Sequence, residues 1–473
     1  MTADALPSTA EIRRAFVGLC LAMLLSALDQ TIVAAALPTI GLELGDFADS
    51  PWIVTAYLVA ATTVTPLYGK LADIHGGRIM LLIGVGVFIL GSIACALAPS
   101  MAALAIARAL QGLGGGGLLA LSQTIIADLV SPRERGRYQT YFAAVFVLSS
   151  IAGPLLGGFF ASHLHWSLIF WINLPLGLLA LLFVESSLRR LPVRRHPHEL
   201  DYIGAALLAA AAGLLALALG HRNAAARDVV GLTILSALFW ALFAHRLRKA
   251  DEPFIPLSVL ANATARNASL CGAFGLGAFV GLSVVAPIYL EGAFGLDADG
   301  VGVALIAPMI GVVIGATISG RLMPHLARYK APGLIGLACA AAASALLALG
   351  LKNLSLVALD ALLTMISIGI GTTLPISTVS LQNAVERRNL GSATAVMQFA
   401  RQIGCALIVA LLGALVMGAG AVALEAEAAT PQAIEALRSA FREVFAVTTV
   451  CVGFALYFLV RMEEKPLRGA PAP

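Results

Sequence analysis

The sequence predicts an all-α integral membrane protein with fourteen transmembrane helices and both termini on the cytoplasmic side. Its composition is the first reason. Hydrophobic residues make up 59% of the 473 positions, charged residues make up only 12%, and the mean hydropathy is +0.92. The charged share is roughly half that of a soluble globular protein, so the apolar surplus must face lipid. Soluble enzymes, nucleic-acid-binding proteins and disordered chains are thereby excluded.

The second reason is the number of apolar runs, because a helix needs about 20 such residues to cross a bilayer. The runs lie near 15–41, 51–71, 79–98, 101–127, 138–160, 166–187, 201–220, 229–245, 268–290, 301–322, 332–351, 354–381, 392–418 and 443–461. A cleaved signal peptide is the alternative for the first run, which follows Arg13 and Arg14. The length of that run and the many runs behind it favour a span.

The third reason is the distribution of basic residues, which accumulate in cytoplasmic loops. With the N-terminus inside, the cytoplasmic segments hold 23 of the 30 lysines and arginines, and the outer loops hold five. The remaining two, Arg108 and Arg401, lie inside spans. This asymmetry supports an even number of spans with both ends inside. The expected location is the cytoplasmic (inner) membrane.

A short repeat predicts two related six-helix halves. Gly69-Lys70-Leu71 follows the second span, and Gly320-Arg321-Leu322 follows the tenth. Paired halves of this kind are typical of secondary transporters. We expect an N-terminal six-helix bundle over 1–190, two linker spans over 191–262 and a C-terminal six-helix bundle over 263–473.

Motifs for enzymatic or metal chemistry are weak or missing. Residues 112–117 match G-x-G-x-x-G, but they lie inside an apolar span, where glycines favour close helix packing over dinucleotide binding. The chain has no G-x-x-x-x-G-K-[ST], no H-E-x-x-H and no C-x-x-C, and its six cysteines are isolated within apolar runs. We therefore expect no enzyme activity, no cofactor, no metal and no disulfide.

Two opposite charges inside the membrane are the leading functional candidates. Asp29 in the first span and Arg108 in the fourth are each expected about 9–10 Å below the outer boundary. Charges at equal depth in one bundle can form a pair. A structural ion pair is one interpretation. Proton transfer is favoured, because carboxylates in membranes are costly and usually lie on ion paths.

Three further positions have more than one interpretation. Arg401 in the thirteenth span binds an anionic group, tunes a carboxylate or only ties helices together. Pro154, between Gly153 and Gly157, makes either a gating bend or a structural kink. Asp360 begins the twelfth span, where interfacial capping is favoured. Thr430-Pro431 predicts the start of a small external helix within 421–442.

Four groups of residues resemble the major facilitator superfamily, and within it the fourteen-span drug:proton antiporters. The first is Leu28-Asp29-Gln30-Thr31-Ile32-Val33 with Leu37-Pro38. The others are the loop residues Gly69, Asp73, Gly76 and Arg78, the fourth-span residues Arg108, Gln111 and Gly112, and the fifth-span residues Gly153, Pro154, Gly157 and Gly158. Ile172-Asn173-Leu174-Pro175 is also typical, and the resemblance covers essentially the whole chain.

The resemblance implies a role for each group. Asp29 would be the carboxylate that couples protons to substrate, with Arg108 as its partner. Gly69, Asp73, Gly76 and Arg78 would form a cytoplasmic latch in the outward-facing state, with Asp73 drawn to a helix N-terminus near Ser392. The residues Gly153, Pro154, Gly157 and Gly158 would seal the outer side. Departures from the family pattern are Ala34, Ile74, Gly77 and Ser149.

The function expected from this resemblance is proton-coupled export, by alternating access, of small amphipathic or cationic compounds, including antibiotics. The expected partners are a small-molecule substrate, protons and lipid, without nucleic acid, and a monomer is the simplest assembly. Candidate substrate-binding residues are Asp29, Trp52, Tyr57, Phe142, Phe146, Phe274, Met309, Met397, Phe399 and Arg401. Transport of an amino acid, a sugar or a siderophore is the alternative on the same fold. A membrane receptor or a membrane enzyme is less consistent with a chain that has neither a soluble domain nor a nucleophile–base cluster.

Overall fold

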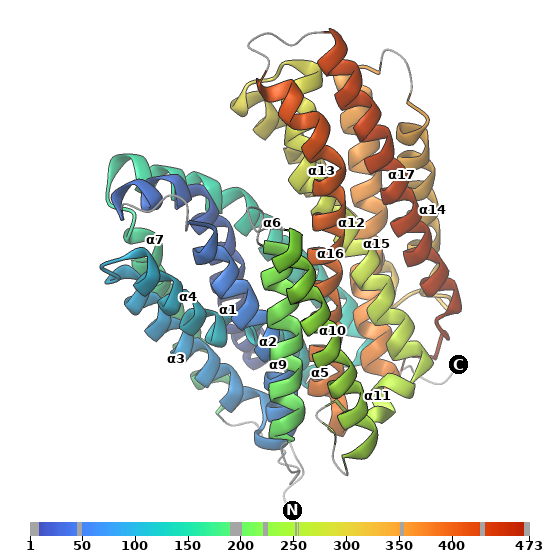
Figure 1. The fold of residues 1–473 in the computed structure, drawn as a ribbon. Coiled ribbons are helices and arrows are strands. Elements are labelled where there is room, and N and C mark those ends of the chain that lie inside the picture. Colours follow the sequence, from blue (N-terminus) through green and yellow to red (C-terminus); the bar gives the residue numbers. More distant parts are fainter. Residues whose placement is uncertain are drawn as a thin grey trace, which may run out of the picture. The chain divides into compact units, whose positions relative to one another are not determined.

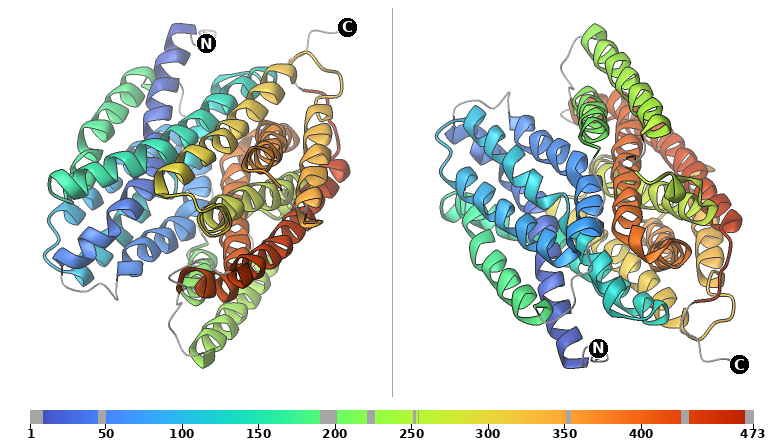
Figure 2. Two further views of the ribbon diagram at one scale, coloured as in Figure 1. Left: turned by 90° about the horizontal axis from the view of Figure 1, so that it is seen from above. Right: turned by 90° about the horizontal axis from the view of Figure 1, so that it is seen from below.

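In a computed structural model, the protein is described at residues 9–44, 50–189, 201–220, 226–250, 253, 255–350, 354–425 and 431–467. These residues form helices and no strands (Figures 1 and 2). Thirteen of the described helical segments are long and apolar enough to cross a membrane, and Tyr202–Leu215 is a shorter apolar helix. Together they correspond to the fourteen runs expected from the sequence. The predicted all-α membrane fold is confirmed.

The helices follow one another with short connections. Their bounds are α1 Thr9–Glu43, α2 Ser50–His75, α3 Gly77–Ala96, α4 Met101–Gly115, α5 Leu118–Leu129, α6 Pro132–His163, α7 Leu168–Trp171, α8 Asn173–Leu188, α9 Tyr202–Gly220, α10 Ala226–Lys249, α11 Leu257–Ala261, α12 Ala263–Phe294, α13 Ala298–Leu322, α14 Ala331–Ala348, α15 Leu356–Ala384, the 3-10 turn η1 Arg387–Asn389, α16 Leu390–Glu425 and α17 Pro431–Arg461. Several helices extend past their apolar run because backbone hydrogen bonding continues into the polar flanks.

The chain divides into two compact units. Unit 1 comprises 1–131, 144–261 and 385–399, and unit 2 comprises 132–143, 262–384 and 400–473. In unit 1, α1 packs against α8, α4 against α2 and α3, and α9 against α2 and α10. Figure 1 shows α9 and α10 side by side. In unit 2, α15 packs against α12, α13 and α14, and α17 against α12 and α14. The predicted boundary at 190 lies outside the described residues.

Two local expectations need correction. The helix start expected at Pro431 is confirmed, but residues 431–442 are the first turns of α17, which runs unbroken to Arg461, and do not form a separate external helix. Thr430 lies outside the described residues. Asp360 does not cap α15, because Ser355 Oγ accepts the hydrogen bond from Ala358 N at 3.2 Å, and Asp360 lies one turn further along. Serine is a favoured N-cap because its hydroxyl accepts from the free N–H groups of the first turn.

Candidate functional site

An ion pair between α1 and α4 forms the centre of unit 1. Arg108 Nη1 donates to Asp29 Oδ2 at 2.5 Å. Asp29 is 0% exposed and Arg108 is 1% exposed. Since water does not reach either group, the attraction between their charges is screened far less than at a surface. The structure thus places together the two intramembrane charges that the sequence expects at equal depth.

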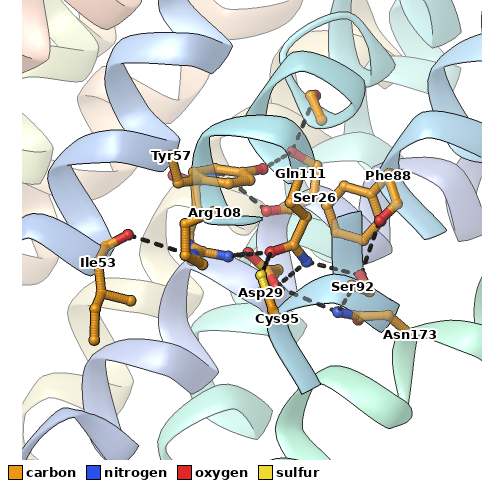
Figure 3. Close-up of polar contacts among 12 residues, drawn as sticks. Ser26, Asp29, Ile53, Tyr57, Phe88, Ser92, Cys95, Arg108, Gln111 and Asn173 are labelled. Carbon is orange, nitrogen blue, oxygen red and sulfur yellow. Dashed lines mark hydrogen bonds and ion pairs between the residues drawn. The ribbon is translucent and has the colours of Figure 1, made fainter. Parts of the chain in front are cut away.

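Neutral side chains complete the coordination of the carboxylate. Asp29 Oδ1 accepts from Gln111 Nε2 at 2.8 Å and from Asn173 Nδ2 at 3.2 Å. The hydroxyl of Ser92 accepts from the same two amides, at 2.8 and 3.3 Å. Figure 3 shows these side chains, from α3, α4 and α8, gathered around Asp29 of α1. We call Asp29, Ser92, Arg108, Gln111 and Asn173 the carboxylate cage.

Arg108 is held on its other sides by α2. Its Nε donates to Ile53 O at 3.2 Å, and its guanidinium carbon lies 4.3 Å from the centre of the Tyr57 ring. A cation over an aromatic face is attracted by the ring quadrupole, more strongly when water is absent. The hydroxyl of Tyr57 lies 3.1 Å from Ser26 Oγ. Any movement of Arg108 therefore disturbs contacts to α1 and α2 as well as α4.

The cage surrounds the Asp29 carboxylate with three hydrogen-bond donors from two other helices. Hydrogen bonds between charged groups are stronger than neutral ones, so the contact from Arg108 is the main attachment of Asp29, and the two amides occupy its other oxygen. If the Arg108 contact opened, a charged carboxylate would be left buried without a counter-ion, which is costly. The ion pair therefore ties the positions of α1 and α4 to each other.

The sequence identifies only part of this cage. Gln111 follows Arg108 by three residues and therefore lies on the same helix face. Ser92 and Asn173 had no assigned role, although Asn173 is the only amide within the apolar run 166–187. A buried amide needs a polar partner, so the lone amide in this run could have identified Asn173 as part of a polar site.

The glycines at 112–117 serve helix packing. A Cβ added at Gly112 or Gly115 would overlap Tyr57, and one at Gly116 would overlap the backbone of Ala61. Thr65 Oγ1 donates to Gly116 O at 2.7 Å through this close approach of α2. The glycines thus bring Tyr57 against Arg108, and they also separate α4 from α5.

The expected latch residues have separate partners in unit 1. Asp73 Oδ1 accepts from Gly391 N at 2.8 Å, and Asp73 Oδ2 accepts from Ser392 N at 2.8 Å and Ser392 Oγ at 2.5 Å. Asp73 therefore caps the first turn of α16, where the helix dipole attracts an anion. Gly69 lies against Gly391, without room for a side chain.

Arg78 contacts a different helix. It forms a two-pronged ion pair with Glu185 of α8 at 2.6 and 3.2 Å. Gly76, between Asp73 and Arg78, has φ +93°, which only glycine adopts at little cost, and this turns the chain from α2 into α3. Asp73 and Arg78 thus hold α2 to α16 and α3 to α8, respectively.

The glycine–proline motif of α6 lies against α1. A Cβ at Gly153 would overlap Thr31, and one at Gly157 would overlap the carbonyl of Ile32. Thr31 Oγ1 donates to Ser149 O at 2.8 Å. Pro154 is exposed, and a Cβ at Gly158 would meet nothing within 4 Å. Gly153 and Gly157 thus let α6 approach the helical turn that carries Asp29.

The candidate substrate-binding residues fall in both units. In unit 1, Tyr57 and Met397 are buried, Phe146 is 42% exposed, Trp52 is half-buried and Phe399 lies 6.1 Å from the Trp240 ring of α10. In unit 2, Phe142 is buried, Met309 is half-buried, Phe274 lies 5.2 Å from the Phe454 ring, and Arg401 donates to Ser377 Oγ at 2.8 Å. Two of the candidate aromatics, Phe274 and Phe399, therefore contact other aromatic rings. Their role in substrate binding stays a prediction.

Comparison with known proteins identifies the family. The Major Facilitator Superfamily model matches residues 19–201 and 200–409. The chain is 34% identical over 406 residues to the multidrug transporter protein MdtP of Bacillus subtilis, covering 84% of this chain and 74% of that protein. It is also 34% identical to multidrug resistance protein 3 of the same organism, covering 84% and 78%.

Solved structures agree at the level of fold. The human organic anion transporter MFSD10 (TETRAN) superimposes with a TM-score of 0.65 at 19% identity, covering 93% of this chain and 99% of that one. The matching family model, the relatives and the fourteen apolar helical segments together lead to one conclusion: the chain belongs to the Major Facilitator Superfamily of membrane transporters.

Proposed function

We propose that this protein is a proton-coupled exporter of small amphipathic or cationic organic compounds that works by alternating access. The observation that carries the proposal is the fully buried Asp29 carboxylate, paired at 2.5 Å with Arg108 inside a membrane bundle. Ionisable groups in such positions are usually functional. The names of the two bacterial relatives, a multidrug transporter and a multidrug resistance protein, support the class of substrate.

The mechanism follows from competition for one negative charge. Deprotonated Asp29 attracts a cationic compound from the inside. On the outside, a proton binds to the same carboxylate and removes that attraction, so the compound leaves. Arg108 keeps its charge throughout, because a guanidinium is not deprotonated in proteins. It therefore assists release of the proton when the site faces the cytoplasm again.

The remaining motifs supply the conformational control. We assign Asp73 and its cap on α16 to a cytoplasmic latch, with Gly69, Gly76 and Arg78 fixing the surrounding helices. We assign the contact of Gly153 and Gly157 with α1 to the outer seal. Both assignments are supported by close contacts, because a Cβ at Gly69 or Gly157 would force the helices apart.

The arrangement in the membrane completes the proposal. Two six-helix bundles, 1–190 and 263–473, are joined by linker spans within 191–262, and both termini lie on the cytoplasmic side of the inner membrane. The excess of lysine and arginine in the segments assigned to the cytoplasm supports this orientation.

Export of ethidium from cells that express the wild type or Asp29→Asn tests the function, with and without a proton uncoupler. We expect uncoupler-sensitive efflux from the wild type and a loss of at least tenfold in Asp29→Asn. The matched control is Asp297→Asn, since Asp297 is exposed and caps α13 through Gly300 N, and asparagine caps equally well. This control is expected to export normally.

Efflux that is insensitive to the uncoupler, or full activity of Asp29→Asn, would contradict proton coupling through Asp29. A wild type that exports none of a panel of cationic and neutral dyes would overturn drug export. In that case, proton-driven movement of a single amino acid, sugar or siderophore becomes the function to test.

A further inference from the structure

Unit 2 contains a second buried guanidinium, and its surroundings differ from those of Arg108. Arg401 of α16 is 4% exposed. Its Nη2 donates to Ser377 Oγ at 2.8 Å and to Thr378 Oγ1 at 3.2 Å, both on α15. Each hydroxyl donates in turn to a carbonyl of its own helix, Thr373 O or Leu374 O. The hydroxyl lone pairs are therefore directed to Arg401.

No carboxylate balances this charge within the part of the chain that the structure describes. The titratable groups that act on Arg401 there are the thiols of Cys271 and Cys405. Its Nε is buried without a hydrogen-bond partner, and Nη1 forms none with the described residues. An arginine has five N–H donors, so about three of them remain without a protein acceptor.

The close approach of α12 keeps the guanidinium in place. A Cβ added at Gly272 would lie 2.6 Å from Arg401 Nε, so the guanidinium lies close to the backbone of α12 at this glycine. The arginine is therefore fixed by three helices, α12, α15 and α16. A fixed planar cation with free donors matches the geometry of a carboxylate.

The cost of this arrangement indicates a missing anion. An isolated buried charge is strongly unfavourable unless a counter-charge is present. A neutral glutamine would tie α16 to the hydroxyls of α15 without that cost. Gln398, one turn earlier on α16, makes such a neutral contact through Nε2 to Gln123 Oε1 at 2.8 Å. Joining helices therefore does not account for a charge at position 401.

The geometry points to Arg401 as the site for the anionic group of a transported compound. The substrates would then include zwitterions and organic acids that carry a carboxylate, in addition to cations. This inference rests on the proposed export function and narrows its chemistry. The free donors of Arg401 bind the carboxylate, and esterification of that carboxylate removes the interaction.

A matched pair of dyes tests the inference by direct binding. Rhodamine 110 carries a free carboxylate, and rhodamine 123 is its methyl ester. Equilibrium binding of each dye is measured by fluorescence polarisation on purified protein in detergent. We expect Arg401→Gln to weaken binding of rhodamine 110 about tenfold to a hundredfold, the factor for one or two charge-assisted hydrogen bonds, and to leave rhodamine 123 within twofold. The affinity of Arg401→Lys for rhodamine 110 is expected to lie between those of the wild type and Arg401→Gln.

Lys330→Gln is the control for loss of a buried cation in the same unit. Lys330 Nζ donates to the carbonyls of Leu459 and Met462 at the end of α17, so its charge already has acceptors. This variant should not distinguish the two dyes. Each variant is first shown to be monodisperse by size-exclusion chromatography, which separates a binding defect from a folding defect.

Transport in proteoliposomes separates this inference from the proposed function. Equal weakening of both dyes in Arg401→Gln, or no change in either, overturns the carboxylate site even if the wild type exports rhodamine 123. A wild type that exports neither dye contradicts drug export. The binding measurement still decides the role of Arg401, because it does not depend on transport.

Discussion

Removal of one charge from the buried ion pair should have an asymmetric effect on stability. In Asp29→Asn, Arg108 keeps its charge at 1% exposure, and every acceptor left to it is a neutral oxygen: that of the introduced amide, that of Gln111 or that of Ile53. Breaking a buried pair in this way costs about 3–5 kcal/mol. In Arg108→Gln, Asp29 can bind a proton and become neutral, and it keeps the amides of Gln111 and Asn173. That loss is expected to be about 1–3 kcal/mol.

The double variant Asp29→Asn/Arg108→Gln completes the cycle. Both charges are then gone, so the double variant should lose about 2 kcal/mol less of its free energy of unfolding than the two single variants together. This coupling lies within the range for residues in direct contact. The assay is the free energy of unfolding of purified protein at pH 7 in mixed micelles with increasing SDS. Additive losses, or an Asp29→Asn variant no less stable than Arg108→Gln, would refute the reasoning.

Three further predictions concern the surrounding motifs. Gly157→Ala should reduce transport and stability, because its Cβ overlaps Ile32 O. Gly158→Ala should instead stabilise α6 by up to about 1 kcal/mol, because its Cβ meets nothing and alanine favours a helix. If both variants changed the free energy of unfolding in the same direction, the packing argument would be refuted. Asp73→Ala should destabilise by about 0.5–2 kcal/mol, because it removes the acceptor of all three hydrogen bonds, and Ser392→Ala should destabilise by less, because it removes only one of the three donors. The reverse order of the two losses in unfolding measurements would exclude the capping role. Glu185→Gln should cost less than about 1 kcal/mol, since Glu185 is 44% exposed and its pair with Arg78 is screened by water and salt; a larger loss at 0.15 M salt would show that the pair is effectively buried.

The transmembrane helices could be predicted from the sequence because lipid imposes one requirement on all of them. Every backbone polar group in the bilayer must be paired within the protein, so a run of about 20 apolar residues indicates a helix. The prediction extends less well to helix ends. The start of α15 is set by Ser355 and not by Asp360, since a hydroxyl one turn earlier already satisfies the free N–H groups.

The candidate site could be predicted in its charges but not in its neutral members. Asp29 and Arg108 are rare charges at equal depth, so their pairing follows from the cost of leaving either alone. Asn173 and Ser92 carry no charge, and their partners depend on the packing of α3 and α8. Arg78 shows a different limit. Near the polar boundary an arginine can reach several acceptors. The sequence groups Arg78 with Asp73 in one motif and does not indicate that its partner is Glu185 of α8.

One helical turn of α1 makes two contacts: Thr31 bonds to Ser149 of α6, and Asp29 pairs with Arg108 of α4. Asp29 and Thr31 are two residues apart, so a helix rotation that opens the carboxylate cage also changes the contact with α6. Under the proposed mechanism, proton access and closure of the outer path are therefore coupled. A larger side chain at Gly153 should produce a protein that conducts protons in the absence of substrate, and the passive acidification of proteoliposomes would measure that leak directly.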